Sequence, residues 1–296
     1  MKKTIVILYA VALAWSGNAN WWGAFDDNYF AVHSPATSGE WIEGVGLPAA
    51  SKISSSAVLG GYLYSTPGYT KTNVYRFDGT SWAEVAGSLW AGGLNGNFAV
   101  SVGNNIYLSQ QGTNFAAFDG ANWERNAALP SSQRWIIGDQ TGRVFAIYPT
   151  KTNRYFFTVG GTNWQAFLES PSHADFGTTA RLGDDMYYMA GQVTNFYRLR
   201  SNVWDQLPGN PGTNRYYNTI VAHAGFVYLI GGSGRANGLD GGTNVYKFDP
   251  ASGVWAEVNG LPEKRIMTTA QSYNGKIYCW GSYQDGDPRT NVFIYE

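Results

Sequence analysis

Cysteine and charge are both scarce in this chain of 296 residues. Cys279 is the single cysteine, so no internal disulfide can form, and we expect its side chain to pack as a small apolar residue. Charged residues make up 14% of the chain, the formal net charge is −1, and no run of Lys or Arg occurs. Nucleic-acid binding is therefore not expected, because it needs a basic surface.

Sequence motifs of the common catalytic centres are also missing. There is no His-Glu-x-x-His, no Gly-x-Ser-x-Gly and no phosphate-binding glycine loop. The three histidines, His33, His173 and His223, fall in different parts of the chain. We therefore expect neither a metal site nor a bound cofactor.

The N-terminus has the pattern of a secretory signal. Met1-Lys2-Lys3 is positively charged, residues 4–15 are apolar, and Gly17-Asn18-Ala19 offers small residues for cleavage. Residues 1–19 are predicted to be a signal peptide, and no later apolar run has the length of a membrane span. The pattern thus predicts a secreted or periplasmic protein, without a membrane span once the signal is removed.

A repeat of about 40 residues organises the rest of the chain. Six Thr-Asn pairs each open a short segment of aromatic or aliphatic residues, at Thr72, Thr113, Thr152, Thr194, Thr243 and Thr290. Five of the pairs are followed by a lone tryptophan, at Trp82, Trp123, Trp164, Trp204 and Trp255. The asparagine is expected to make a local hydrogen bond to the backbone at the start of a strand. Short strands at this period predict a β-propeller.

Residues 215–262 show one repeat most clearly. Residues 216–222 and 226–230 are predicted as its first two strands, a and b, joined by a turn at Gly225. Residues 244–248 and 254–258 are predicted as strands c and d, separated by the turn residues 249–253. Four antiparallel strands make one blade.

This unit resembles the kelch repeat. Gly231-Gly232 closes strand b, and a tyrosine precedes the tryptophan by the family's spacing in Tyr75 to Trp82 and in Tyr197 to Trp204. The resemblance covers nearly the whole mature chain and implies a kelch-like β-propeller. The double glycine is in register in one repeat only, so no particular kelch subfamily follows.

The chain ends indicate how the ring closes. The last segment, residues 290–295, is a strand c with no strand d after it, whereas Trp41 lies in a strand d setting with no strand c assigned to it. We expect the Trp41 segment to complete the C-terminal blade, which gives six blades without open sheet edges. Residues 28–33 also have a strand c pattern, so seven blades are the alternative; otherwise residues 20–38 form an edge strand or clasp beside a single propeller domain at 39–296.

Candidate binding residues lie where the d-to-a connections enter strand a. These connections share one face of a propeller with the b-to-c connections. The candidates on this face are Lys52, Arg134, Trp135, Asp175, Arg215, Tyr216 and Arg265. Guanidinium groups can bind both oxygens of a carboxylate, and aromatic faces suit sugars. The structural alternative is that these residues pair with neighbours such as Glu263.

Three functions follow as hypotheses. The first is a non-catalytic scaffold that binds a glycan or an extracytoplasmic protein through this face, as a monomer. The second is an enzyme acting on an anionic sugar. It is suggested by similarity to exported kelch-type sialic acid mutarotases, and a channel carboxylate such as Asp139 or Asp175 would be its base. The third is a structural surface protein that assembles through residues 233–242.

Overall fold

The computed structural model describes residues 39–50, 54–66, 68, 72–87, 89, 98–110, 112–130, 136–140, 142–147, 154–158, 163–167, 177–191, 193–211, 216–234, 241–284 and 287–296. Met1–Gly39 and Glu40–Glu296 are separate compact units. The predicted signal peptide and the segment 20–38 lie outside the described residues. None of the described segments is a helix with the length and apolar character of a membrane span.

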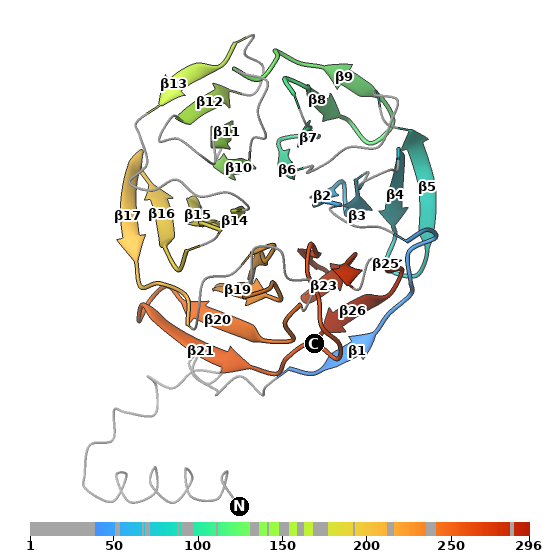
Figure 1. The fold of residues 1–296 in the computed structure, drawn as a ribbon. Helices are drawn as coiled ribbons and strands as arrows, with labels where there is room; N and C mark the ends of the chain where they lie inside the picture. The colour runs from blue at the N-terminus through green and yellow to red at the C-terminus, as the bar shows by residue number, and fades with distance from the viewer. Residues whose placement is uncertain are drawn as a thin grey trace, which may run out of the picture. The chain divides into compact units, whose positions relative to one another are not determined.

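The described strands form six antiparallel four-stranded sheets and one two-stranded ribbon (Figure 1). The innermost strands, a, are β2 (Ser56–Leu59), β6 (Phe98–Val102), β10 (Ile136–Gln140), β14 (Thr178–Leu182), β18 (Thr219–His223) and β22 (Thr269–Tyr273). Strands b, next outward, are β3 (Tyr62–Ser65), β7 (Asn105–Ser109), β11 (Arg143–Ile147), β15 (Asp185–Met189), β19 (Phe226–Ile230) and β23 (Lys276–Trp280).

The outer halves of the sheets follow the same order. Strands c are β4 (Asn73–Phe77), β8 (Phe115–Phe118), β12 (Arg154–Thr158), β16 (Phe196–Arg200), β20 (Val245–Asp249) and β26 (Val292–Tyr295). Strands d are β5 (Trp82–Gly87), β9 (Trp123–Arg125), β13 (Gln165–Phe167), β17 (Val203–Leu207), β21 (Val254–Val258) and β1 (Trp41–Glu43). The ribbon pairs β24 (Tyr283–Gln284) with β25 (Asp287–Pro288).

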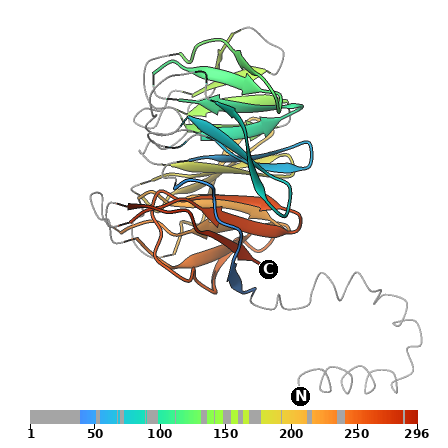
Figure 2. The same cartoon turned by 90° about the vertical axis from the view of Figure 1, so that its right-hand side faces the viewer.

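The inner strands surround a central axis. Each contacts the inner strand of the next sheet along the chain, and β22 contacts β2, so the order is cyclic. Viewed from the edge, the sheets lie side by side with their strands running between two faces (Figure 2). The expected all-β propeller is confirmed.

The chain ends meet in one sheet. Strand β1 lies outside β26, with Trp41 paired to Tyr295 and Glu43 paired to Phe293. The pairing continues beyond the strands, because Gly44 N donates to Val292 O at 2.8 Å. The expected pairing of the Trp41 segment with the last strand is therefore present.

The hydrophobic core lies between neighbouring sheets. One cluster joins Tyr187, Met189 and Phe196 of one sheet to Ile220 and Leu229 of the next. Both faces of the b strands are buried, which explains why segments such as Asp185–Met189 have continuous apolar runs rather than alternation. Packing between sheets thus accounts for most of the repeated aromatic residues.

One strand boundary differs from the sequence prediction. Strand β18 begins at Thr219, whereas the alternation predicted a strand from Tyr216. Tyr217 has a φ of 58°, a left-handed conformation that a strand cannot contain. Tyr216 forms only an isolated bridge with Ser233.

Candidate functional site

The two faces of the ring differ in the length of their connections. Each a-to-b connection is a two-residue turn, such as Gly60-Gly61 or Gly183-Asp184. The d-to-a connections are much longer, for example residues 88–97 and 259–268, and the b-to-c connections include residues 231–244. We call these the turn face and the loop face.

The Thr-Asn pairs form backbone hydrogen bonds with the d-to-a connections near the point where these leave their sheets. In four sheets the carbonyl oxygen of the threonine accepts a hydrogen bond from a backbone N–H of a d-to-a connection. These bonds are Leu47 to Thr290 at 2.8 Å, Leu129 to Thr113 at 2.9 Å, Asn210 to Thr194 at 3.0 Å and Leu261 to Thr243 at 2.7 Å. The pairs therefore build the scaffold under the loops.

Three of the asparagine side chains bond a side chain of the neighbouring strand d, where the sequence predicted a local bond to the backbone. Asn73 Nδ2 donates to Glu84 Oε1 at 2.6 Å. Asn244 bonds Glu257 at 2.8 Å, and Asn291 bonds Glu43 at 2.6 Å. In each case an amide at the start of strand c bonds a carboxylate on strand d, which is a charge-assisted bond.

Five of the candidate binding residues, Lys52, Arg134, Trp135, Asp175 and Arg215, lie outside the described residues. Tyr216 is half-buried on the loop face. Its backbone N–H donates to Ser233 O at 2.8 Å, and its ring centroid lies 6.5 Å from that of Tyr217. Tyr216 is thus placed beside a second aromatic ring, at the entry to β18.

Arg265 is fully buried, although the sequence placed it with the ligand candidates. Its Nη2 is bonded to Glu263, and its guanidinium carbon lies 4.7 Å from the centroid of the Phe293 ring. Its backbone also bonds Gly232 and Gly242. These contacts give Arg265 the structural role that was the alternative for the candidates, and they join its d-to-a connection to the b-to-c connection that follows β19.

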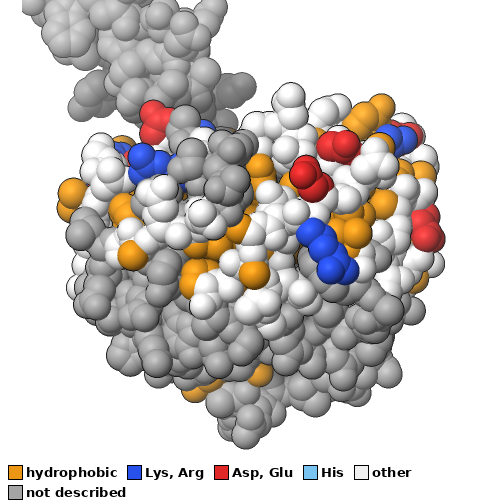
Figure 3. Space-filling model, turned by 90° about the horizontal axis from the view of Figure 1, so that it is seen from above, with side chains coloured by type: hydrophobic (Ala, Val, Ile, Leu, Met, Phe, Trp, Pro, Cys, Tyr) orange, Lys and Arg blue, Asp and Glu red, His pale blue; other side chains and the backbone are white. Residues whose placement is uncertain are grey.

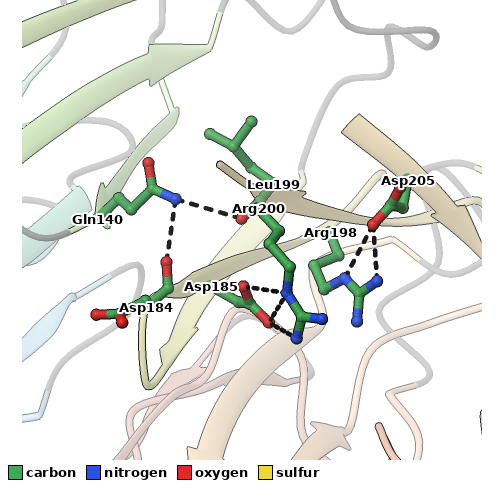
Figure 4. Close-up of polar contacts among 7 residues, drawn as sticks. All are labelled: Gln140, Asp184, Asp185, Arg198, Leu199, Arg200 and Asp205. Carbon is green, nitrogen blue, oxygen red and sulfur yellow. Dashed lines mark hydrogen bonds and ion pairs between the residues drawn. The ribbon is translucent and has the colours of Figure 1, made fainter. Parts of the chain in front are cut away.

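Ion pairs gather on the turn face of the sheet β14 to β17 (Figure 4). Arg200 Nε lies 2.8 Å from Asp185 Oδ1, and Arg198 Nη2 lies 2.7 Å from Asp205 Oδ2. Gln140 reaches over from the preceding sheet and donates to Asp184 O at 3.0 Å. The groups satisfy one another, which indicates a structural cluster.

Aspartates stabilise the c-to-d turns on the same face. Asp78 Oδ1 accepts from the backbone N–H of Thr80 at 2.7 Å and of Ser81 at 2.8 Å, and these bonds lower the pKa of Asp78 to about 2. Asp119 and Asp249 accept similar bonds. The Asp-Gly turns are therefore structural.

The central channel has a volume of about 470 Å³. Strands of all six sheets line it, and its polar side chains include Ser56, Thr179, Thr269 and Gln271. Phe98 is its single aromatic lining residue among those described. Since each inner strand is hydrogen-bonded on one edge only, unpaired backbone groups also face the channel.

Two opposite charges meet in the channel. Arg181 Nη1 lies 3.2 Å from Asp139 Oδ2, and Arg181 Nε donates to Gly183 O at 2.8 Å. Burial raises the pKa of Asp139 to about 6, and the nearby Arg181 opposes that rise. Asp139 was predicted from the sequence as a possible channel carboxylate, whereas Arg181 was not predicted.

The remaining reactive side chains have structural surroundings. His223 Nδ1 lies 2.9 Å from Ser272 Oγ, and burial lowers its pKa. Cys279 is fully buried, which raises the pKa of its thiol to about 11. Within the described ranges, no three His, Cys, Asp or Glu side chains lie together as a metal site would require.

Comparisons with known proteins place the chain among propellers. Residues 36–179, just under half of the chain, match a family described as "DUF6242 beta propeller domain". A segment of 104 residues is 26% identical to "Kelch-like protein 31" from Danio rerio, covering 33% of this chain and 16% of that relative. The solved structure "Structure of YjhT" has a TM-score of 0.72 at 12% identity, covering 84% of this chain and 96% of that one.

The match to a kelch protein agrees with the double glycine, the spaced Tyr and Trp, and the four-stranded sheets. The chain is a kelch-repeat β-propeller. Because the matched segment covers only 16% of the length of this kelch-like relative, the match supports the repeat and not a shared activity.

On the side seen in Figure 3, the described charged side chains do not gather into a patch of one sign. Acidic and basic side chains are isolated spots there, among polar and apolar residues. This distribution agrees with the net charge of −1.

Proposed function

We propose that this kelch propeller is an exported scaffold that binds a glycan or an extracytoplasmic protein through its loop face. The observation that carries the proposal is the difference between the two faces. The a-to-b connections on one face are two-residue turns, whereas long connections such as 259–268 and 231–244 cover the other. Long loops held by a rigid scaffold are where binding residues are usually found.

The scaffold under these loops supports recognition. Bonds such as Leu261 N to Thr243 O at 2.7 Å fix where a loop leaves its sheet. A loop with fixed ends loses less conformational entropy when it binds a partner. Lys52, Arg134 and Arg215 follow such anchors in the sequence, and we assign them to the partner contact.

A glycan array probed with the mature chain from residue 20 tests the proposal. Wild type is expected to bind, and the Arg134→Glu and Arg215→Glu double variant is expected to lose the signal. Arg143→Glu is the control for each single substitution, because it makes the same change of charge and Arg143 starts β11 beside a two-residue turn on the turn face. Equal binding by the double variant would refute the choice of face, whereas a blank array would favour a protein partner.

The number of blades forms part of the proposal. We infer six blades, closed by β1, from the six four-stranded sheets and the cyclic contacts of their inner strands. A seventh blade would need a further sheet between two inner strands that are already in contact. Deleting residues 40–47 would remove the outer strand of the closing sheet, and a large loss of thermal stability is the expected result. An unchanged Tm would contradict the closure.

A second function has one observation in its favour. Asp139 combines a pKa of about 6 with a neighbouring guanidinium in the channel, which suits proton transfer near neutral pH. An enzyme that interconverts the anomers of an anionic sugar would use these groups as base and anchor. Proton NMR of sialic acid anomers decides it: faster exchange with wild type than with Asp139→Asn supports the enzyme, and an unchanged rate removes it.

The third function, assembly at a cell surface through residues 233–242, is tested by the mass in solution. A monomer at all concentrations contradicts assembly and agrees with a scaffold that binds as a single propeller.

A further inference from the structure

One position of the inner strands varies from sheet to sheet and is charged in two of them. It lies two residues before each a-to-b turn and holds Val58, Ser101, Asp139, Arg181, Ala222 and Ser272. The first five of these line the channel. Two adjacent sheets therefore place opposite charges side by side, near the turn face.

We propose that this turn-side part of the channel binds an uncharged sugar, with Asp139 and Arg181 forming hydrogen bonds to its hydroxyl groups. The site is distinct from the loop face and does not depend on the glycan or protein binding proposed there. The ligand class follows from the volume, the lining and the charge balance of the channel.

The size and lining of the channel suit a small polar molecule. About 470 Å³ lies within the range of ligand pockets and accommodates a sugar ring. From the level of Asp139 and Arg181 toward the loop face, Ser56, Thr179, Thr269 and Gln271 add hydroxyl and amide groups to the walls, and Phe98, at the loop end of β6, adds an aromatic surface. Sugars need this combination, because they present hydroxyl groups at their edges and apolar C–H groups on their faces.

The polar side chains two residues before the a-to-b turns can form more hydrogen bonds than the contact between Asp139 and Arg181 uses. Asp139 accepts from Arg181 at one oxygen, whereas an ionised carboxylate has acceptor sites for about four bonds. Ser101, from the neighbouring sheet, has a buried hydroxyl oxygen with no hydrogen-bond partner among the described groups. Buried polar groups are normally satisfied, so these atoms favour a polar occupant.

The charges favour an uncharged ligand. Arg181 is already paired with Asp139, so the two side chains carry no net charge together. An anionic sugar would be attracted to the guanidinium of Arg181, but its carboxylate would also lie close to the carboxylate of Asp139. Two negative charges that are close together and partly buried repel strongly. The hydroxyl groups of a neutral sugar can donate to the carboxylate and accept from the guanidinium.

Saturation-transfer NMR with the mature chain tests the site, using D-glucose, D-galactose, D-mannose and N-acetylneuraminate as probes. At least one neutral sugar is expected to bind. Asp139→Asn and Gln271→Leu are each expected to weaken that binding about ten-fold or more, because a buried polar contact is lost. Asp205→Asn is the matched control, since Asp205 pairs with Arg198 outside the channel and is 41% exposed.

The pH dependence of binding distinguishes a neutral sugar from an anionic one. Among the described residues, Arg181 is the charged side chain that faces Asp139; the adjoining strand β6 carries none, and Asp185 of β15 is paired with Arg200. Protonation of Asp139 at pH 5 should therefore weaken a neutral sugar that donates to the carboxylate. Tighter binding of N-acetylneuraminate at pH 5, with no neutral sugar bound, would overturn the ligand class.

Two further results would overturn the site itself. The first is equal binding by wild type and both channel variants when each is folded by circular dichroism. The second is loss of the neutral-sugar signal in the Arg134→Glu and Arg215→Glu variant alone, which would move the sugar to the loop face. Failure of the glycan array leaves the channel site standing, because an immobilised glycan chain need not enter a channel.

Discussion

The repeated tryptophans join neighbouring sheets, and two of them provide a test of this role. Four indole N–H groups donate to a backbone oxygen in the d-to-a connection of the preceding sheet. These bonds are Trp41 to Asn259 at 2.9 Å, Trp82 to Val45 at 3.0 Å, Trp164 to Ala127 at 3.1 Å and Trp255 to Pro208 at 3.0 Å. The Nε1 atoms of Trp123 and Trp204, by contrast, are buried without a partner among the described groups.

Replacing a tryptophan by phenylalanine should therefore have a different effect at the two kinds of position. In Trp82→Phe, about 1 kcal/mol of packing and about 1 kcal/mol for the hydrogen bond are lost, which gives about 2 kcal/mol. In Trp204→Phe, a similar packing loss is offset by removal of a buried, unsatisfied donor that costs about 1 to 3 kcal/mol. The net change at Trp204 should be close to zero.

Urea unfolding of the two variants and wild type measures the difference. We expect the urea midpoint to fall clearly for Trp82→Phe. For Trp204→Phe, the free energy of unfolding should stay within about 0.5 kcal/mol of wild type, at equal m-values. Both rings are half-buried and pack on aromatic neighbours, so the pair is well matched. Equal losses would refute the idea that the indole bond joins the sheets.

Three further predictions follow from single contacts. Because burial raises the pKa of Asp139 from 3.8 to about 6, folding takes up a proton between these values, and wild-type stability relative to Asp139→Asn should fall by about 2 kcal/mol from pH 4 to pH 7 in urea titrations. Gly260→Ala should lower the Tm, since its Cβ would lie 2.7 Å from a backbone oxygen, whereas Gly87→Ala, with nothing within 4 Å, should not. Glu257→Ala should lose up to about 1 kcal/mol, and a double-mutant cycle with Asn244→Ala should recover that coupling.

The fold was readable from the sequence because the repeat places the same residue types at the same step of each sheet. The pairing of the Trp41 segment with the final strand could be predicted, because the final strand c had no strand d after it and the Trp41 segment was a strand d without a strand c. Trp41 does pair with Tyr295. Strand edges were less predictable. The left-handed Tyr217 shortens β18, and nothing in the alternation of residues 216–222 indicates it.

The candidate site was harder to predict, because the sequence does not show which polar groups are already paired. Arg265 matched the other cations by position but is buried against Phe293. Arg181 was not among the predicted site residues because the candidates were taken from the loop-face connections, whereas Arg181 lies in an inner strand. Aligning the inner strands on their two-residue turns would have found it, since Arg181 and Asp139 occupy the same step of adjacent sheets.

In a repeat protein, scaffold residues and site residues differ in whether their bonds recur from sheet to sheet. An asparagine that recurs with the same bond to strand d, as Asn73, Asn244 and Asn291 do, is already occupied by a carboxylate. Its side chain is then unavailable for a ligand, however polar it is. Asp139 and Arg181 stand where other sheets have Val58 or Ala222, and they bring charge into a channel that the fold does not require to be charged. A buried charge carries a desolvation cost, so a departure of this kind from the repeat is the place where function is expected.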